Sequence, residues 1–205
     1  MNRLVTQILL AAQLGLAACG VYAQSQSAPR AKEVVLASLA QAAAAPGAAA
    51  NTARPDALAV SVLTEGPLNM LVTRSVEAPF STGDKFRIKL LSPRDGEVAI
   101  FNTPPVGETS KAPIWRARVK AGVESVSNLM QLTGNRGVDQ LHVVLLPSGH
   151  SGDPFPAFQG MMAANGSAGK SAKDIRLVTE NTNQGTYFYN PNGQGGFVTI
   201  HIRHQ

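Results

Sequence analysis

The segment from Gly149 to Asp153 comes nearest, in residue types and spacing, to a catalytic motif. It reads Gly-His-Ser-Gly-Asp and resembles the G-x-S-x-G turn that presents a nucleophilic serine. A hydrolase built on it would use Ser151 as nucleophile, His150 as base and Asp153 to orient the base. Other partners of the same types are His142, His201, Asp139 and Asp174. Asp153 occupies the place of the final glycine, and two prolines directly after it argue against the helix that the motif requires. We therefore predict no catalytic residue, with a small serine hydrolase centred on Ser151 as the alternative.

Two further patterns could bind a nucleotide or a metal, and neither is complete. Residues 166–171 resemble a phosphate-binding loop, but Ala164 stands where that pattern needs its first glycine, and neither the strand before it nor the helix after it is evident. His201 and His204 are three residues apart, which places them on opposite faces of a strand, so they cannot easily share a metal ion. We predict no cofactor and no metal site, and we expect His201 to face solvent and His204 to lie at a frayed end.

The elements that hold these residues are predicted to be β-strands. Apolar and charged residues alternate with a period of two from Phe86 to Leu90 and again from Trp115 to Lys120, as in strands with one buried face. The predicted strands are 57–63, 70–76, 80–91, 97–101, 114–120, 138–146, 174–180, 185–190 and 196–203. The segment between the fifth and sixth strands, 125–132, is predicted to be a short helix or an irregular crossing. The pattern predicts an all-β fold, an antiparallel sandwich of seven to nine strands.

Three stretches of this sandwich carry more specific expectations. The strand from Val138 to Leu146 is apolar on both faces from Leu141 onward apart from His142, so we place this strand at the centre of a sheet. The Pro-Arg-Asp-Gly run that ends at Gly96 predicts a turn in which this glycine takes a positive φ and closes a hairpin. Residues 147–173 are rich in Gly, Ser and Ala and are predicted to be a long loop, which is uncommon unless functional or disordered.

The first 56 residues are predicted to lie outside the sandwich, which would occupy residues 57–205. Residues 1–23 have the basic end and short apolar run of an export leader. Two ways of leaving the leader compete: cleavage after Ala23, or lipidation of Cys19, because Leu-Ala-Ala-Cys resembles the lipobox of bacterial lipoproteins. Either way the domain has no disulfide. Residues 24–56 predict a poorly packed, partly helical tether.

Several turns and one strand resemble a bacterial envelope family, domain-of-unknown-function family 4384. The residues that carry the likeness are Gly83-Asp84, Asp95-Gly96, Pro105-Val106-Gly107 and the strand from Leu141 to Pro147. The likeness covers about residues 57–147. Members of this family stand alone behind signal peptides or are appended to caspase-like peptidases or protein kinases. The resemblance implies an immunoglobulin-like sandwich and no assigned catalytic residues.

The charges of the chain narrow the choice of partner. There are 18 Lys and Arg against 13 Asp and Glu, and the basic residues are scattered, so we predict no nucleic-acid partner. Five basic residues in alternating positions could form one basic sheet face: Arg87, Lys89, Arg116, Arg118 and Lys120. Such a face is either a solvated surface that discourages edge-to-edge pairing or a surface that attracts lipid headgroups or an acidic partner.

We therefore predict a non-enzymatic domain that is exported to the cell envelope, as an outer-membrane lipoprotein or as a periplasmic or secreted protein. Its partner would be another protein or an envelope polymer, and it would meet the membrane only through a lipid on Cys19. The residues predicted to bind are Phe155, Phe158, Met161, Met162, Arg116 and Arg118.

Overall fold

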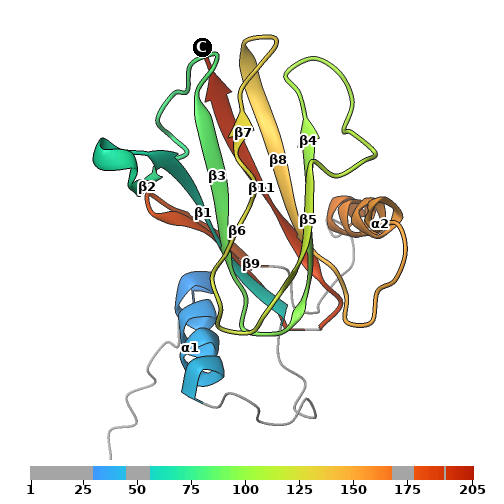
Figure 1. The fold of residues 1–205 in the computed structure, drawn as a ribbon. Coiled ribbons are helices and arrows are strands. Elements are labelled where there is room, and N and C mark those ends of the chain that lie inside the picture. The colour runs from blue at the N-terminus through green and yellow to red at the C-terminus, as the bar shows by residue number, and fades with distance from the viewer. Residues whose placement is uncertain (1–29, 45–55, 168–177, 192) are drawn as a thin grey trace, which may run out of the picture.

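The computed structural model describes residues 30–44, 56–167, 178–191 and 193–205. Within these ranges the chain forms two antiparallel β-sheets that pack face to face, and a helix lies against the outer face of each sheet (Figure 1). The prediction of an all-β sandwich is therefore confirmed. The two helices extend it to four layers, in the order helix, sheet, sheet, helix.

The two sheets differ in size and regularity. The first has the strand order β6-β3-β1-β10-β9, with β2 paired to β1 and β7 paired to β3. Its strands are β1 (Asp56–Glu65), β2 (Leu71–Arg74), β3 (Lys85–Leu91), β6 (Ser125–Val126), β7 (Met130–Gln131), β9 (Val178–Thr182) and β10 (Gly185–Asn190). The second has the order β11-β8-β4-β5. Its strands are β4 (Gly96–Thr103), β5 (Trp115–Val119), β8 (Gly137–Leu145) and β11 (Gly196–His204). The alternative of a helix over 125–132 is wrong, because this segment crosses the edge of the first sheet through β6 and β7.

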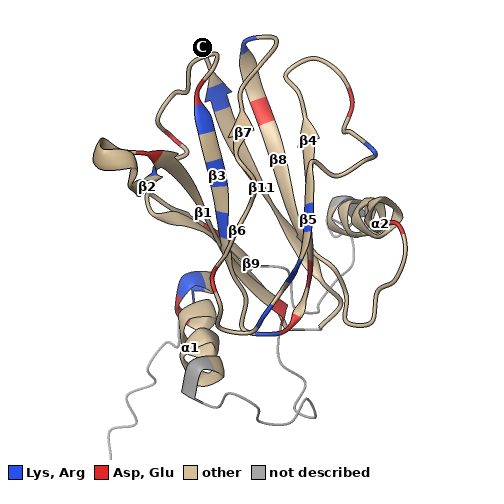
Figure 2. Cartoon of the chain, viewed as in Figure 1, with Lys and Arg blue, Asp and Glu red and all other residues tan. Residues whose placement is uncertain are grey.

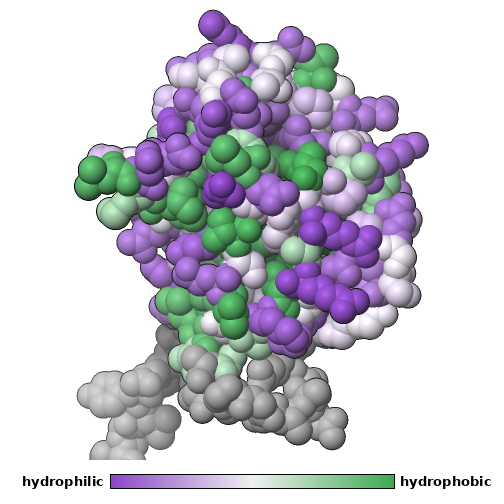
Figure 3. Space-filling view, viewed as in Figure 1, coloured by the Kyte–Doolittle hydropathy of each residue, from purple (hydrophilic) through white to green (hydrophobic). Residues whose placement is uncertain are grey.

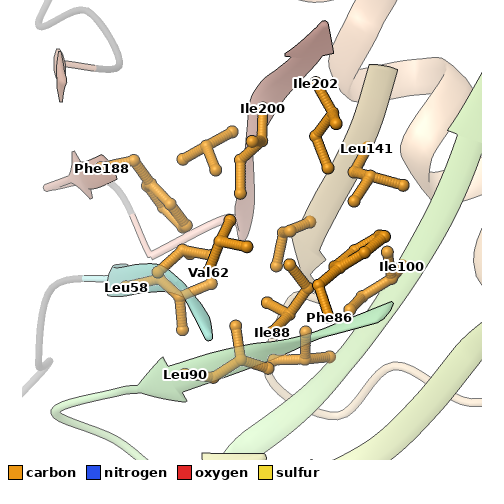
Figure 4. Packing of buried hydrophobic residues seen from close by; sticks show 14 of the residues in the cluster. Leu58, Val62, Phe86, Ile88, Leu90, Ile100, Leu141, Phe188, Ile200 and Ile202 are labelled. Atoms are coloured by element: carbon orange, nitrogen blue, oxygen red, sulfur yellow. The ribbon is translucent and has the colours of Figure 1, made fainter. Parts of the chain in front are cut away.

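The core lies between the two sheets and is built from the alternating apolar residues of their strands (Figure 4). Phe86, Ile88 and Leu90 of β3 point inward, as the period of two predicted. Strand β8 lies between β11 and β4, and its Val143 is 0% exposed. The prediction that this strand is central is confirmed.

Helix α1 (Ala31–Ala44) covers the outer face of the first sheet. Val35 and Leu39 are buried against Ala57 of β1 and Tyr187 of β10. The amide of Lys32 also donates a hydrogen bond of 3.0 Å to Oε2 of Glu180 on β9. The helix is therefore part of the folded unit, and the prediction of a poorly packed tether is wrong over this helix.

Helix α2 (Pro154–Ser167) covers the outer face of the second sheet (Figure 1). Oδ1 of Asp153 accepts a hydrogen bond of 3.0 Å from the amide of Phe155, as a helix-capping carboxylate does. Pro154 occupies the first position of the helix, where its missing N–H leaves nothing unpaired. The prediction of a loop without a helix over 147–173 is therefore wrong over 154–167.

The turn before Gly96 does not close a hairpin. Strand β3 belongs to the first sheet and β4 to the second, so the Asp95-Gly96 turn carries the chain from one sheet to the other. Gly96 is not among the glycines with positive φ, and it is already the first residue of β4. Its small size is needed for another reason, since a Cβ here would lie 2.7 Å from Nη1 of Arg94.

A buried ion pair with Asp56 holds the Arg94 side chain next to Gly96. Its Nε donates to Oδ1 of Asp56, its Nη2 donates to the carbonyl of Leu146 at 2.8 Å, and its Nη1 donates to the carbonyl of Asp95 at 2.9 Å. Oδ2 of Asp56 accepts from the amide of Gly195. The pair thus joins the start of β1, the crossing between the sheets, the end of β8 and the turn before β11.

Candidate functional site

Two cavities lie where α2 meets the second sheet, and another lies at the end of the sandwich beside the 147–150 turn. The end cavity, of about 340 Å³, is lined by residues 94–97, 118–120 and 147–150. The middle cavity, of about 510 Å³, is lined by residues 111–113, Arg116 and residues 152–154. The third, of about 370 Å³, is lined by Glu108, Thr109, Lys111, Phe155, Phe158, Gln159 and Met162. The middle and third cavities share Lys111, and we call the two together the α2 groove.

The floor of the α2 groove is aromatic and rigid. The ring of Phe158 stacks on that of Phe101 with centroids 5.0 Å apart and planes 6° apart, and Phe155 lies 5.6 Å from the same ring. Phe158 is 1% exposed, whereas Met162 is 42% exposed. Of the apolar residues predicted to bind, Phe158 is therefore a core residue that holds α2 on the sheet, and Met162 is the one most open to a partner. Met161 is partly buried and packs against the same cluster.

The rim of the groove is charged. Arg116 forms an ion pair with Glu97, and its pKa is raised mainly by that hydrogen bond, with a smaller contribution from the charge of Asp153. Lys111 is exposed and has no hydrogen bond or ion pair within the part of the chain that the structure describes. An apolar floor with a polar and charged rim is the anatomy of a protein-binding surface.

The basic residues of β3 and β5 do not form one sheet face. The two strands lie in different sheets, and Figure 2 marks the positions of their basic residues along the ribbon. Because the apolar residues of both strands point into the common core, the basic residues of β3 and β5 point to opposite sides of the molecule. Four of the five are also paired: Arg87 with the carbonyl of Ser127, Lys89 with Glu124, Arg116 with Glu97 and Lys120 with Asp95. Arg118 is the exception in the described residues, since no partner neutralises its guanidinium.

The three residues of the predicted hydrolase alternative are neighbours in sequence but are not joined by hydrogen bonds in the described chain. Ser151 is exposed, the Asp153 carboxylate caps α2, and Nε2 of His150 is buried without a hydrogen-bond partner. The Asp153 carboxylate, which would have to orient the base, therefore caps α2 instead. Asp174 lies outside the described residues.

His142 is buried under α2, where it serves packing. Its Nε2 lies 2.8 Å from Oγ1 of Thr103 and its Nδ1 lies 2.9 Å from Oγ1 of Thr199, while its ring lies 5.0 Å from that of Phe158. Burial, followed by the charge of His201, lowers the pKa of His142 to about 4. The side chain is therefore neutral at physiological pH and holds the outer face of β8 to β4 and β11.

A second histidine joins a carboxylate and a hydroxyl at the far end of the sandwich. Nε2 of His204 lies 2.8 Å from Oγ1 of Thr82, and its Nδ1 lies 3.6 Å from Oδ2 of Asp139. Burial raises the pKa of Asp139 against the opposing effect of His204. His204 is 3% exposed, so the prediction of a frayed end is wrong, whereas His201 is exposed as predicted. None of the three cavities is lined by these residues, and the cluster lies at the start of β8, beside the last residue of β11.

One exposed apolar feature lies away from the groove and had no sequence signal. The turn η1 (Pro67–Asn69) projects from the first sheet, and hydrophobic surface gathers there in Figure 3. Leu68 is 93% exposed and Met70 is 62% exposed. Leu68 and Asn69 have φ of 60° and 58°, a left-handed backbone that leucine rarely adopts.

Other expectations concern metals, membranes and the leader. Across residues 30–44, 56–167 and 178–205, apart from 192, the structure has no cluster of three or more His, Cys, Asp or Glu that could hold a metal ion. No helix of the same residues is long and apolar enough to span a membrane. Cys19 and Ala23 lie outside the described residues, and so does most of the segment 166–171 that resembles a phosphate loop.

Comparison with known proteins returns no matching family model, no similar curated protein and no similar solved structure. The resemblance to family 4384 therefore stays a prediction.

Proposed function

We propose that this chain is a non-enzymatic domain of the bacterial cell envelope, which binds another protein or an envelope polymer through the α2 groove. The observation that carries the proposal is the groove itself. It combines an aromatic floor with the exposed side chain of Met162 and the ammonium of Lys111, which has no partner among the described residues.

Two properties of the groove support binding. Phe155 and Phe158 are held against Phe101 of β4 by ring contacts, so the floor does not need to be ordered when a partner arrives. Methionine adapts its shape to an apolar partner, and a lysine on the rim can pair with an acidic group of that partner. A partner with an apolar side chain next to a carboxylate fits this combination.

The binding proposal can be tested by crosslinking and then by affinity. A photo-crosslinking amino acid at position 162 should capture a defined partner from envelope extracts, whereas the same group at position 68 should not. With the purified partner, Met162→Asp should raise Kd at least tenfold, about 1.4 kcal/mol, while Leu68→Asp leaves it unchanged. Equal capture at both positions, or an unchanged Kd for Met162→Asp, would remove the groove as the binding surface.

The proposed location depends on Cys19. Only a cysteine can carry the diacylglycerol through its thioether, and several acyl chains together anchor a protein firmly. Wild-type protein should partition with membranes, and Cys19→Ser should not. Intact mass spectrometry of the mature chain provides the decisive reading: a chain that begins at Gln24 without lipid mass contradicts the anchor and leaves a soluble exported protein.

The enzymatic alternative is open to a direct chemical test. A fluorophosphonate probe labels an activated serine, and a domain that only binds should not react at Ser151. Labelling of the wild-type chain that disappears in Ser151→Ala would contradict the non-enzymatic proposal.

A further inference from the structure

The end cavity is separate from the α2 groove and has its own chemistry. It lies at the end of the sandwich where β8 leaves the second sheet, between the 147–150 turn and the strands β4 and β5. The turn is held by a hydrogen bond of 3.1 Å from the amide of His150 to the carbonyl of Pro147, with Gly149 at a φ of 77°. One wall of the cavity is therefore the 147–150 turn, which is closed by this hydrogen bond.

The acidic groups in this cavity are already neutralised. Asp95 forms an ion pair of 2.8 Å with Lys120 and accepts a hydrogen bond of 2.9 Å from the amide of Ala121. Glu97 is paired with Arg116, outside the cavity. All three guanidinium nitrogens of Arg94 donate hydrogen bonds within the protein, and the charge of Arg94 is balanced by Asp56.

Two polar side chains that line the cavity, Arg118 and His150, have no partner for their side-chain nitrogens in the described chain. The guanidinium of Arg118 has no hydrogen bond or ion pair within the described chain. Nε2 of His150 is buried and also has no partner. A buried polar atom without a hydrogen bond is costly, and such an atom in a native fold calls for an explanation. An acceptor bound in the cavity would provide one, since both side chains line it.

We infer that the end cavity is a binding site for an oxyanion, namely the carboxylate or phosphate group of a larger molecule. The planar fork of Arg118 matches two oxygens of either group, and the imidazole of His150 supplies a third hydrogen bond in the tautomer that carries its proton on Nε2. The volume of about 340 Å³ equals that of about ten water molecules, which is more than a bare ion needs. The site therefore holds the anionic group together with part of the molecule that carries it. This inference does not depend on the α2 groove.

The test uses inorganic phosphate and acetate as separate probes at constant ionic strength, with chloride as the background salt. Nuclear magnetic resonance of the full chain should show saturable shifts at His150 and Ser148, with a Kd on the order of 1–10 mM. Saturation by phosphate alone assigns a phosphate group, saturation by acetate alone assigns a carboxylate, and saturation by both assigns the shared oxyanion chemistry.

Arg118→Gln removes the charge of an exposed and unpaired side chain, so the variant should fold, and it should raise Kd at least tenfold. Arg136→Gln is the matched control, because Arg136 is also exposed and precedes β8 at its other end, about 30 Å from the cavity. His150→Gln should weaken binding while leaving the turn intact. The inference is overturned if neither probe saturates, if Arg118→Gln binds like the wild type, or if Arg136→Gln loses as much affinity as Arg118→Gln.

Discussion

Removal of the Asp56 carboxylate should be among the most damaging single changes that this fold can suffer. Asp56 is 1% exposed and Arg94 is 7% exposed, so Asp56→Ala leaves a guanidinium buried without its counter-charge. The amide of Gly195 loses its acceptor at the same time. Breaking a buried pair from one side costs about 3–5 kcal/mol. We expect about 3 kcal/mol, because the carbonyls of Asp95 and Leu146 still accept two of the guanidinium hydrogen bonds.

The measurement is urea unfolding followed by the fluorescence of Trp115. It is the single tryptophan of the chain and packs against the core, so it reports on the sandwich. A small domain has a total stability of about 5–15 kcal/mol, so a loss of about 3 kcal/mol will shift the midpoint clearly. Glu124→Ala is the control, since the Lys89–Glu124 pair is exposed and should contribute under about 1 kcal/mol.

A double-mutant cycle separates the pair from its surroundings. Arg94→Ala should also be destabilising, because it leaves the Asp56 carboxylate buried and unpaired. The double variant should be more stable than the sum of the two single losses predicts, by about 2 kcal/mol. A loss below 1 kcal/mol for Asp56→Ala, or strictly additive effects, would refute the reasoning.

Three further changes test other parts of the fold. Gly96→Val should destabilise by about 1–3 kcal/mol, because its Cβ would meet Nη1 of Arg94 at 2.7 Å; an unchanged urea midpoint would contradict this contact. Val143→Asp should prevent cooperative folding, since it buries an unpaired carboxylate. Val138→Asp is the control, because this position on the same strand is 41% exposed and the variant should fold. A Val143→Asp protein that is soluble and unfolds cooperatively would argue against the central position of the strand. The pKa of His142 is about 4 in the fold and near 6.5 in the unfolded chain, so the unfolded chain binds the extra proton between these values. Stability should therefore fall by on the order of 2–3 kcal/mol as the pH drops through that window, and the same slope in His142→Gln would contradict the assignment.

The sandwich was predictable because its strands alternate apolar and charged residues. The run from Phe86 to Leu90 has one wet and one buried face, and the structure places it that way. In the strand from Val138 to Leu146, the part from Leu141 onward lacks this alternation, and this indicated a strand with both faces covered. A strand that is apolar on both faces needs a cover on each, and α2 is the cover on the outer face.

Helix α2 was not predicted, because the loop-like composition of residues 147–173 was given more weight than the positions of individual residues. Two prolines and several Gly, Ser and Ala residues read as a loop, yet Asp153 followed by Pro154 is also a helix start. Phe155, Phe158 and Met162 follow at intervals of three and four, which is the helical period. Those signals were in the sequence and favour the structure that formed.

The prediction of a hairpin turn at Gly96 was wrong for a different reason. Asp-Gly is the strongest short-range signal for a hairpin, but here a residue 38 positions away decides the geometry. Asp56 pairs with Arg94 at the point where the chain passes from the first sheet to the second. The lack of a partner for Arg118 within the described chain could not be predicted for the same reason. The other four basic residues of the alternating pattern have partners that only the folded chain brings together.

The packing of α1 sets how far the sandwich can stand from a membrane. If Cys19 carries a lipid, the connection from the lipid to the folded unit ends at α1 and not at the start of β1 at Asp56, because α1 (Ala31–Ala44) packs on the first sheet. That leaves about eleven residues, which reach about 40 Å when fully extended, against about 130 Å for a connection that ran to β1. A partner would then have to lie close to the bilayer surface, because the domain could not reach far across the periplasm.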